Sequence, residues 1–214
     1  MLRFLSKIIL YIILFFAFLV VWGRFFNPII TITQLEGVFM YQKLQRDYVS
    51  SDEMGTHIKR AVIGAEDQLF YTHNGFDYKA IEKAFEYNQK GKKIRGGSTI
   101  SQQTAKNVFL WNGRSYIRKG FEAVFTFIIE KAWGKEIILE RYLNSIEMGR
   151  GVFGIEAAAY YYYGKSAKNL TKSEAAWIAT ILPSPKKYDP HNPSPYLKKR
   201  HKWIMRQMNN VKIP

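Results

Sequence analysis

The chain has 214 residues, 47% of them hydrophobic, which is enough for one packed domain beside an N-terminal segment. Its 32 Lys and Arg against 17 Asp and Glu give a formal net charge of +15, which indicates an anionic partner: nucleic acid, an acidic membrane surface or a phosphorylated substrate. The absence of cysteine excludes disulfides, thiolate metal sites and a cysteine nucleophile.

An uncharged apolar run, IILYIILFFAFLVVWG, covers residues 8–23. Its length is near the short end of the roughly 17–25 residues that a transmembrane helix needs. Basic residues precede the run, and Trp22 lies at its far edge, where interfacial aromatic residues occur. The competing interpretation is a cleaved signal peptide, but no small-x-small cleavage site follows. We therefore predict that residues 1–26 are a cytoplasmic N-terminus and a retained single-pass anchor, with the rest of the chain outside the cytoplasm. Nucleic acid is not an expected partner there.

Residues 27–57 are predicted to be a connector, in which the β-branched run 29–33 favours a short extended stretch. Residues 58–214 are predicted to form one mainly α domain, because apolar side chains recur at helical spacing and strand signals are scarce. A basic amphipathic segment begins at Pro195. The expected helices cover residues 58–70, 116–133, 136–146 and 154–163, and a further helix is opened by a Thr171-x-x-Glu174 capping box and ended by Pro183.

The segment from residue 76 to residue 95 has weaker periodicity and carries six Lys and Arg. One interpretation is a solvated basic loop. The other is a mobile flap that lies on acidic lipid headgroups, where each cation contributes on the order of 1 kcal/mol.

Two carboxylates, Glu66 and Asp67, stand together in the string EDQLFYTHNG. Adjacent side chains on a helix point in different directions, so at most one of them faces a given cleft. From spacing alone, a solvated glutamate on a helix surface is the ordinary interpretation, and a catalytic carboxylate is the alternative.

The string GGSTISQQTAKN covers residues 96–107, and its Thr99-x-x-Gln102 pattern predicts the start of a helix. A helix N-terminus that follows glycines is a ready site for an anion. Gln102 and Lys106 are four residues apart and share a helix face, with Gln103 beside them. The alternative is an ordinary capped surface helix.

Arg118 and Glu122 are also four residues apart, and an exposed pair of this kind contributes only about 0.3–0.5 kcal/mol. A surface ion pair is therefore the simplest interpretation. A functional role is favoured by the high density of basic residues in one short stretch, which contains Lys106, Arg114, Arg118 and Lys119.

Other motifs are excluded. Ser184-Pro185-Lys186-Lys187 fits the S-x-x-K pattern of penicillin-binding transpeptidases, but it follows a helix-ending proline and no K-T-G follows it. The four histidines show no metal-ligand spacing, and no phosphate-binding glycine motif offers a site for a nucleotide sugar or another organic cofactor.

Five strings in order make the chain resemble the peptidoglycan glycosyltransferases of family 51, and specifically the short monofunctional members without a transpeptidase domain. The strings are EDQLFYTHNG, GGSTISQQTAKN, RKGFE, KEIILERYLN and GVFGIEAAAYYYYGK. They cover residues 61–185 approximately. The resemblance implies a lysozyme-like helical fold and a polymerase that joins molecules of lipid II, transferring a sugar from a lipid-diphosphate donor to the 4-hydroxyl of an acceptor sugar.

The resemblance also implies roles for individual residues. Glu66 would be the general base that removes the proton of the acceptor hydroxyl, and Glu122 would assist near the donor. Asp67 would have a metal-binding or structural role. The residues implied to bind substrate are Lys106 and Arg114, which would hold the diphosphate, together with Ser98, Gln102, Gln103 and Arg118.

The implied surroundings follow from the same resemblance. The substrate and the charge excess suit an acidic membrane, with the anchor in the bacterial cytoplasmic (inner) membrane and the catalytic domain on the outer, periplasmic side. A divalent metal, Mg²⁺ or Mn²⁺, would assist departure of the diphosphate. Other cell-wall synthases or division proteins would be partners. One departure is SIEMGRG, where relatives often have an aromatic residue after the glutamate; we expect no effect on the chemistry.

Two alternatives compete with a polymerase. A lysozyme-like enzyme that cleaves finished glycan would also use a pair of glutamates, but it needs neither a cationic diphosphate site nor an anchor. A non-catalytic membrane-tethered scaffold for cell-wall proteins would tolerate the loss of Glu66 and Lys106, and both residues are present.

Overall fold

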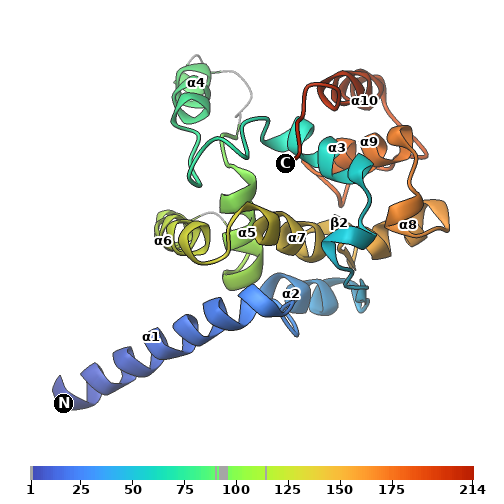
Figure 1. The fold of residues 1–214 in the computed structure, drawn as a ribbon. Coiled ribbons are helices and arrows are strands. Elements are labelled where there is room, and N and C mark those ends of the chain that lie inside the picture. Colours follow the sequence, from blue (N-terminus) through green and yellow to red (C-terminus); the bar gives the residue numbers. More distant parts are fainter. Residues whose placement is uncertain (1, 90, 92–95, 114) are drawn as a thin grey trace.

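A computed structural model describes residues 2–89, 91, 96–113 and 115–214, and they form a mainly α structure (Figure 1). The first helix, α1 (Leu2–Phe25), contains the predicted apolar run and is long and apolar enough to cross a membrane. Only 6% of its most apolar window is buried against the rest of the chain. The predicted fold class, a mainly α domain behind a single N-terminal apolar helix, is confirmed.

The helices expected in the second half of the chain are present. Their bounds are α6 (Tyr116–Ala132), α7 (Lys135–Ser145), α8 (Ile155–Tyr163), α9 (Lys172–Ile181) and α10 (Pro195–Gln207). Both predicted capping boxes form, because the hydroxyls of Thr99 and Thr171 accept hydrogen bonds from the backbone N–H groups three residues later. The first of them opens α5 (Ile100–Phe109).

Three local predictions were wrong. The helix expected over residues 58–70 is α3 (Thr56–Glu66); it ends four residues early, so Asp67 lies outside it. The extended connector is interrupted by α2 (Ile32–Tyr41), which Thr31 opens with a third capping box. For the segment 76–95, the interpretation as a loop is wrong, because the segment contains α4 (Tyr78–Gln89); the interpretation as a flap on acidic lipid headgroups stays a prediction. Lys90, Lys92, Lys93 and Arg95 lie outside the described residues.

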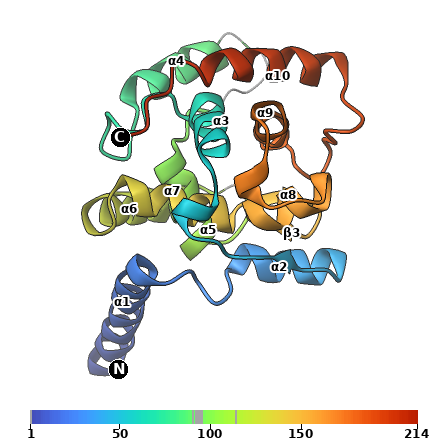
Figure 2. The same ribbon diagram turned by 45° about the vertical axis from the view of Figure 1, so that its right-hand side comes forward.

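The helices form two packed groups. The middle helix α5 packs against α6 and α7, while α3, α9 and α10 pack against one another above it (Figures 1 and 2). A small three-stranded sheet joins the connector to the domain. In it, β3 (Val152–Phe153) pairs in parallel with β1 (Gln45–Arg46) and antiparallel with β2 (Glu147–Gly149). Hydrogen bonds from Ile100 and Gln103 of α5 reach Asp67 and Glu66 at the end of α3, and they bring the first two motifs together.

Candidate active site

Glu66 is the last residue of α3, and its side chain is 17% exposed. Gln103 on α5 donates a hydrogen bond from Nε2 to Oε2 of Glu66 at 3.2 Å. Arg200 on α10 donates from a terminal guanidinium nitrogen to Oε1 at 3.0 Å. Each carboxylate oxygen therefore has one donor, and a carboxylate oxygen can accept a further hydrogen bond from a substrate hydroxyl.

Burial raises the pKa of Glu66 above the ordinary value for a glutamate. The positive charge of Arg200 and the hydrogen bond from Gln103 act in the opposite direction, and the negative charge of Asp67 adds to the rise. Desolvation is the largest of these influences. A carboxylate with a raised pKa is a stronger base, which is what proton abstraction from a sugar hydroxyl requires.

Arg200 was not singled out by sequence reasoning. It lies in the amphipathic segment that begins at Pro195, three residues after the buried Leu197 and four before the buried Ile204. That spacing places Arg200 on the apolar stripe of α10, and an arginine at a buried position was the signal that could have found it. Its Nε atom is buried and has no hydrogen-bond acceptor in the described part of the chain.

Asp67 accepts a hydrogen bond at the N-terminus of α5 and thereby stabilises the start of that helix. Its Oδ2 accepts a hydrogen bond from the backbone N–H of Ile100 at 2.9 Å, and both carboxylate oxygens lie 3.0 Å from Nε2 of His73. Gly75 donates its N–H to Nδ1 of His73, so the proton on that ring is at Nε2 and is donated to Asp67. A carboxylate at a helix N-terminus is favourable because the first N–H groups of a helix lack partners.

The two glutamines of the second motif have different surroundings. Gln102 is 4% exposed, and its Oε1 accepts the hydrogen bond from the backbone N–H of Thr99 that completes the capping box. Gln103 is half-buried; besides donating to Glu66, it accepts a hydrogen bond from the hydroxyl of Tyr142 at 3.4 Å. Gln103 therefore lies beside Glu66, whereas Gln102 stabilises the helix that carries it.

Glu122 is buried, with a side chain that is 4% exposed, and is held by two cations. Arg118 donates to Oε2 at 2.6 Å, and Lys119 contacts Oε1. Lys119 also donates to the hydroxyl of Ser98 at 3.1 Å. The pair of Arg118 and Glu122 is therefore not an exposed surface pair. It joins the first turn of α6 to the glycine-rich segment before α5.

Lys106 faces this cluster from α5. Burial lowers the pKa of its ammonium; the charge of Glu122 raises it, and those of Arg118 and Lys119 lower it again. The backbone carbonyl of Lys106 accepts a hydrogen bond from Leu110, but its side chain forms no hydrogen bond or ion pair with a described residue. Arg114, its expected partner in holding the diphosphate, lies outside the described residues.

A pocket of about 540 Å³ opens beside these side chains. Its lining includes Gln103, Lys106 and Tyr142 together with the segment 182–187. Lys186, which belongs to the S-x-x-K string that was set aside, lies here and pairs with Glu147 at 3.3 Å. The sequence pointed to neither of these two residues as part of the site.

No group of three or more His, Asp or Glu that could hold a metal ion occurs among the described residues. Asp67, the predicted ligand, has both oxygens engaged by Ile100 and His73. These residues do not form a metal cage. Mg²⁺ is often bound mainly by substrate phosphates with one or two carboxylates, so the divalent metal stays a prediction.

The comparisons with known proteins agree on one family. The transglycosylase family model matches residues 32–209, a span that begins inside the predicted connector. Three similar proteins are named biosynthetic peptidoglycan transglycosylases. That of Mannheimia succiniciproducens is 52% identical over 79% of this chain and 69% of its own length. That of Haemophilus influenzae is 51% identical over 83% and 72%, and that of Shewanella oneidensis is 46% identical over 92% and 88%. The chain therefore belongs to the transglycosylase family, as its five motifs predict.

Proposed function

We propose that this chain polymerises the glycan strands of peptidoglycan from lipid II, in the synthesis of the bacterial cell wall. Family membership and the names of the relatives support a peptidoglycan glycosyltransferase. The observation that carries the mechanism is the environment of Glu66: a largely buried carboxylate with a raised pKa, held on both oxygens next to a pocket that a lysine lines.

In the proposed reaction, Glu66 takes the proton of the acceptor sugar's 4-hydroxyl. The hydroxyl oxygen attacks the anomeric carbon of the donor, and the bond from that carbon to the diphosphate oxygen breaks. Gln103 and Arg200 hold the carboxylate in one orientation, so that it meets the hydroxyl without prior reorganisation. General base catalysis of this kind typically contributes about 10²–10⁴-fold.

Lys106 is the proposed partner of the departing diphosphate, together with Arg114. Negative charge develops on the leaving oxygen, and a cation placed there beforehand stabilises that charge most strongly in a water-poor site. Lys106 suits the role because it is half-buried and makes no ion pair with a described residue. A lysine that is already paired with a carboxylate would stabilise the negative charge of the diphosphate less strongly.

Glu122 has both oxygens engaged by cations, and we propose that it assists near the donor by holding Arg118 and Lys119 in place. Lys119 in turn reaches Ser98, and this places a cation and a hydroxyl beside the glycine-rich segment. For Asp67 we propose the structural role, because its two oxygens stabilise the start of the helix that carries Gln103 and Lys106.

The substrate and the place of the reaction belong together. A lipid-diphosphate sugar stays in a membrane through its hydrocarbon chain, and α1 would keep the enzyme in the same membrane. We propose the bacterial cytoplasmic membrane, with the catalytic domain on its outer side. Association with other cell-wall synthases or division proteins stays a prediction.

The test is incubation of the purified full-length chain with labelled lipid II, followed by gel electrophoresis of the products. A ladder of polymer that needs Glu66 is expected. Release of fragments from finished glycan, without polymer from lipid II, would show a lytic enzyme instead. If the chain bound lipid II but neither polymerised it nor cleaved finished glycan, the result would favour a non-catalytic membrane-tethered scaffold.

A further inference from the structure

A second hollow lies at the small three-stranded sheet, apart from the pocket that Lys106 lines. Its volume is about 360 Å³. It is lined by the segment 44–47, which contains β1, and by three residues of α8, namely Ala157, Tyr160 and Tyr161. The strand order is β1, β3, β2, so β1 lines the hollow at one edge of the sheet, while Glu147 of β2 lines the catalytic pocket at the other. The proposed reaction uses none of the residues that line the hollow.

The wall formed by α8 follows from helical spacing. Tyr160 and Tyr161 come three and four residues after Ala157, so the three side chains share one face of the helix. Ala157 is small and leaves room beside the two rings. The helix itself packs on the sheet, as Figure 2 shows for α8 and β3, yet Tyr160 is 54% exposed and Tyr161 is 50% exposed. Two neighbouring tyrosine rings are therefore open to solvent at the edge of a hollow.

The wall formed by the segment 44–47 supplies polar groups. The guanidinium of Arg46 donates to Oε1 of Gln34 at 3.0 Å and to the hydroxyl of Tyr48 at 3.2 Å, so it is held by these two side chains. Asp47 is exposed, and its carboxylate makes no hydrogen bond or ion pair with a described residue. The amide of Gln45 can both donate and accept a hydrogen bond. The hollow thus offers hydrogen-bonding groups of both kinds beside two aromatic rings.

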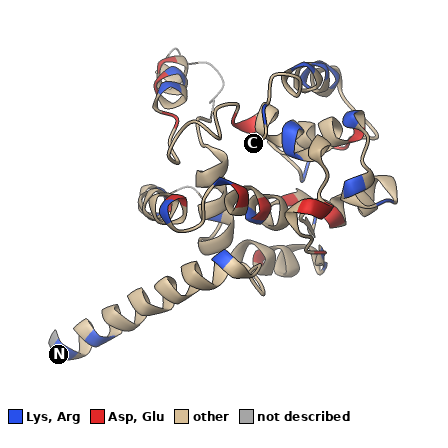
Figure 3. Cartoon of the chain, viewed as in Figure 1, with Lys and Arg blue, Asp and Glu red and all other residues tan. Residues whose placement is uncertain are grey.

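The charge around the hollow differs from that of the chain as a whole. Helix α8 contains no Lys or Arg, whereas basic residues follow one another along α10 (Figure 3). Lys43 lies beside the hollow with its ammonium over the ring of Tyr161, 4.7 Å from the ring centroid. The carboxylate of Asp47 repels an anion that enters the hollow. The lining therefore suits a neutral ligand that is rich in hydroxyl or amide groups.

A line of contacts leads from the catalytic pocket toward the hollow. Lys186, which lines the catalytic pocket, has its ammonium 5.4 Å from the ring centroid of Tyr41. Lys43 follows Tyr41 by two residues and lies over Tyr161. Neighbouring strands of a sheet are about 4.8 Å apart, so the two outer strands of this sheet are separated by roughly 10 Å. A short run of linked sugars spans such a distance.

We propose that the hollow is a second binding site for the growing glycan strand, in which Tyr160 and Tyr161 pack against sugar rings and Asp47 accepts a hydrogen bond from the sugar. The C–H groups of a sugar ring carry small positive partial charges and are attracted by the negative face of an aromatic ring. A peptide is a poorer occupant, because a β1 edge of two residues is too short for a further strand to pair with it. A strand that is held both here and in the catalytic pocket dissociates less readily between additions. The choice of this glycan as ligand rests on the proposed function.

The first experiment measures sugar binding without lipid II, so its outcome does not depend on the proposed reaction. The purified full-length chain in detergent is titrated with a hexasaccharide of N-acetylglucosamine, which is neutral and carries no lipid, diphosphate or peptide. Saturation transfer from protein to sugar is followed by NMR. We expect Tyr160→Ala and Tyr161→Ala each to weaken binding about tenfold, and Tyr160→Phe to keep most of it because the ring remains.

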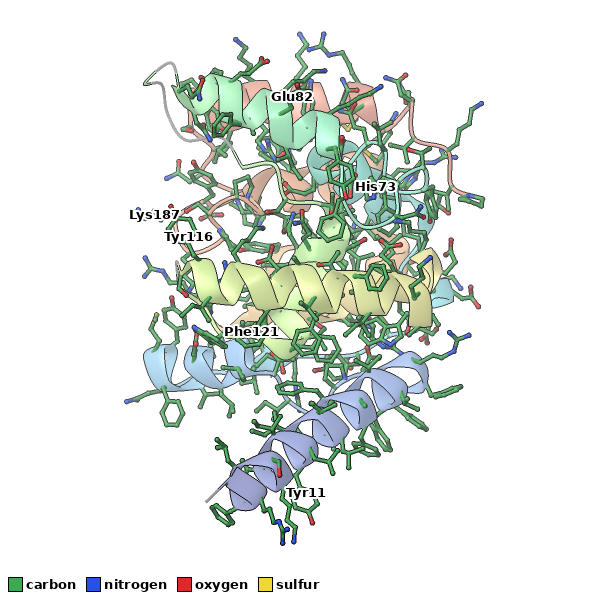
Figure 4. The ribbon with its side chains drawn as sticks, turned by 90° about the vertical axis from the view of Figure 1, so that its left-hand side faces the viewer. Tyr11, His73, Glu82, Tyr116, Phe121 and Lys187 are labelled. Atoms are coloured by element: carbon green, nitrogen blue, oxygen red, sulfur yellow. The ribbon has the colours of Figure 1, made fainter. Side chains whose placement is uncertain are left out.

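Phe121→Ala is the matched control, because it removes an aromatic ring of similar exposure, 49%, from α6 (Figure 4). Its binding of the hexasaccharide should equal that of the unaltered chain. No binding by the unaltered chain, or equal binding by both tyrosine-to-alanine variants, would overturn the proposal. A stem peptide of the cell wall without sugar is the second probe. If it bound instead and lost binding in the same two variants, the hollow would be a peptide site and the proposal would be wrong.

The second experiment compares the products made from labelled lipid II. We expect the variant with both Tyr160→Ala and Tyr161→Ala to release shorter glycan strands than the unaltered chain. Strands of unaltered length would overturn the proposal that a growing strand occupies the hollow. Absence of polymer from the unaltered chain would count against the proposed function alone, and the hexasaccharide titration would still decide whether the hollow binds sugar.

Discussion

Arg200 and Glu66 are 134 positions apart in the chain, and their side chains meet at 3.0 Å. The guanidinium opposes the rise that burial causes in the pKa of the carboxylate and fixes one of its oxygens. Helix α10 therefore contributes to the site at which the first motif begins. The environment of the proposed general base therefore depends on two elements, α3 and α10, that lie far apart in the sequence of the domain.

Glu66→Gln should lose about 10²–10⁴-fold in polymerisation, because glutamine has nearly the same shape but does not accept a proton at working pH. Binding of lipid II or of a diphosphate-bearing inhibitor should persist, since Lys106 and Gln103 remain. The measurement pairs product formation on gels with a binding assay. Activity within a few-fold of wild type would show that Glu66 is not the base and would direct attention to Glu122. Loss of binding as well would make Glu66 a positioning residue.

Arg200→Met should move the acid limb of the pH–activity profile to higher pH. The proposed reaction needs Glu66 ionised. Removal of the guanidinium removes an influence that lowers the pKa of Glu66, so that pKa rises further. Arg200→Lys keeps the positive charge and should show a smaller displacement. The measurement is kcat/KM as a function of pH for the three proteins. An acid limb that moves to lower pH, or not at all, would contradict the electrostatic link.

Lys106→Ala should cost about 2–5 kcal/mol of transition-state stabilisation, in line with the removal of one member of a buried charge pair formed with the substrate. The alkaline limb of the pH–activity profile provides a second test of the role of Lys106. Burial lowers the pKa of Lys106, so its charge is lost at lower pH than that of an ordinary lysine. Lys106→Arg should extend activity to higher pH even where its maximum is reduced, because the pKa of a guanidinium lies well above that of an ammonium. Turnover near that of wild type in Lys106→Ala would show that this cation does not act on the leaving group.

Asp67→Ala should destabilise the domain, by roughly 2–3 kcal/mol, because it removes a charged acceptor from the N–H of Ile100 and from His73. Asp52→Ala is the control, since that side chain is exposed. The measurement is thermal unfolding of the full-length chain in detergent. Equal unfolding temperatures for the two variants would count against the structural role. Asp67→Asn keeps an acceptor oxygen and should therefore lose less stability than Asp67→Ala. Its loss of activity should also be smaller than that of Glu66→Gln.

Much of the architecture could be read from local patterns in the sequence. The apolar stripe of α6, the capping boxes at Thr99 and Thr171, and the apolar run in α1 all depend on residues within a few positions of one another. Each of these features depends only on residues that are close together in the sequence, so the spacing of residue types is enough to predict it. The family and its reaction were visible as well, because five motifs kept their order along the chain.

What lay beyond the sequence was every property that depends on how the helices pack. Spacing showed that Arg118 and Glu122 could pair, but not that the pair is buried and meets Lys119 and Ser98. The end of α3 at Glu66 turns Asp67 toward the start of α5, a partner 33 residues away. The hydrogen bond from the indole of Trp133 to the backbone of α1 is a contact of the same kind. Burial and long-range partners arise from tertiary packing, because they bring together groups whose separation in the chain leaves no periodic signal.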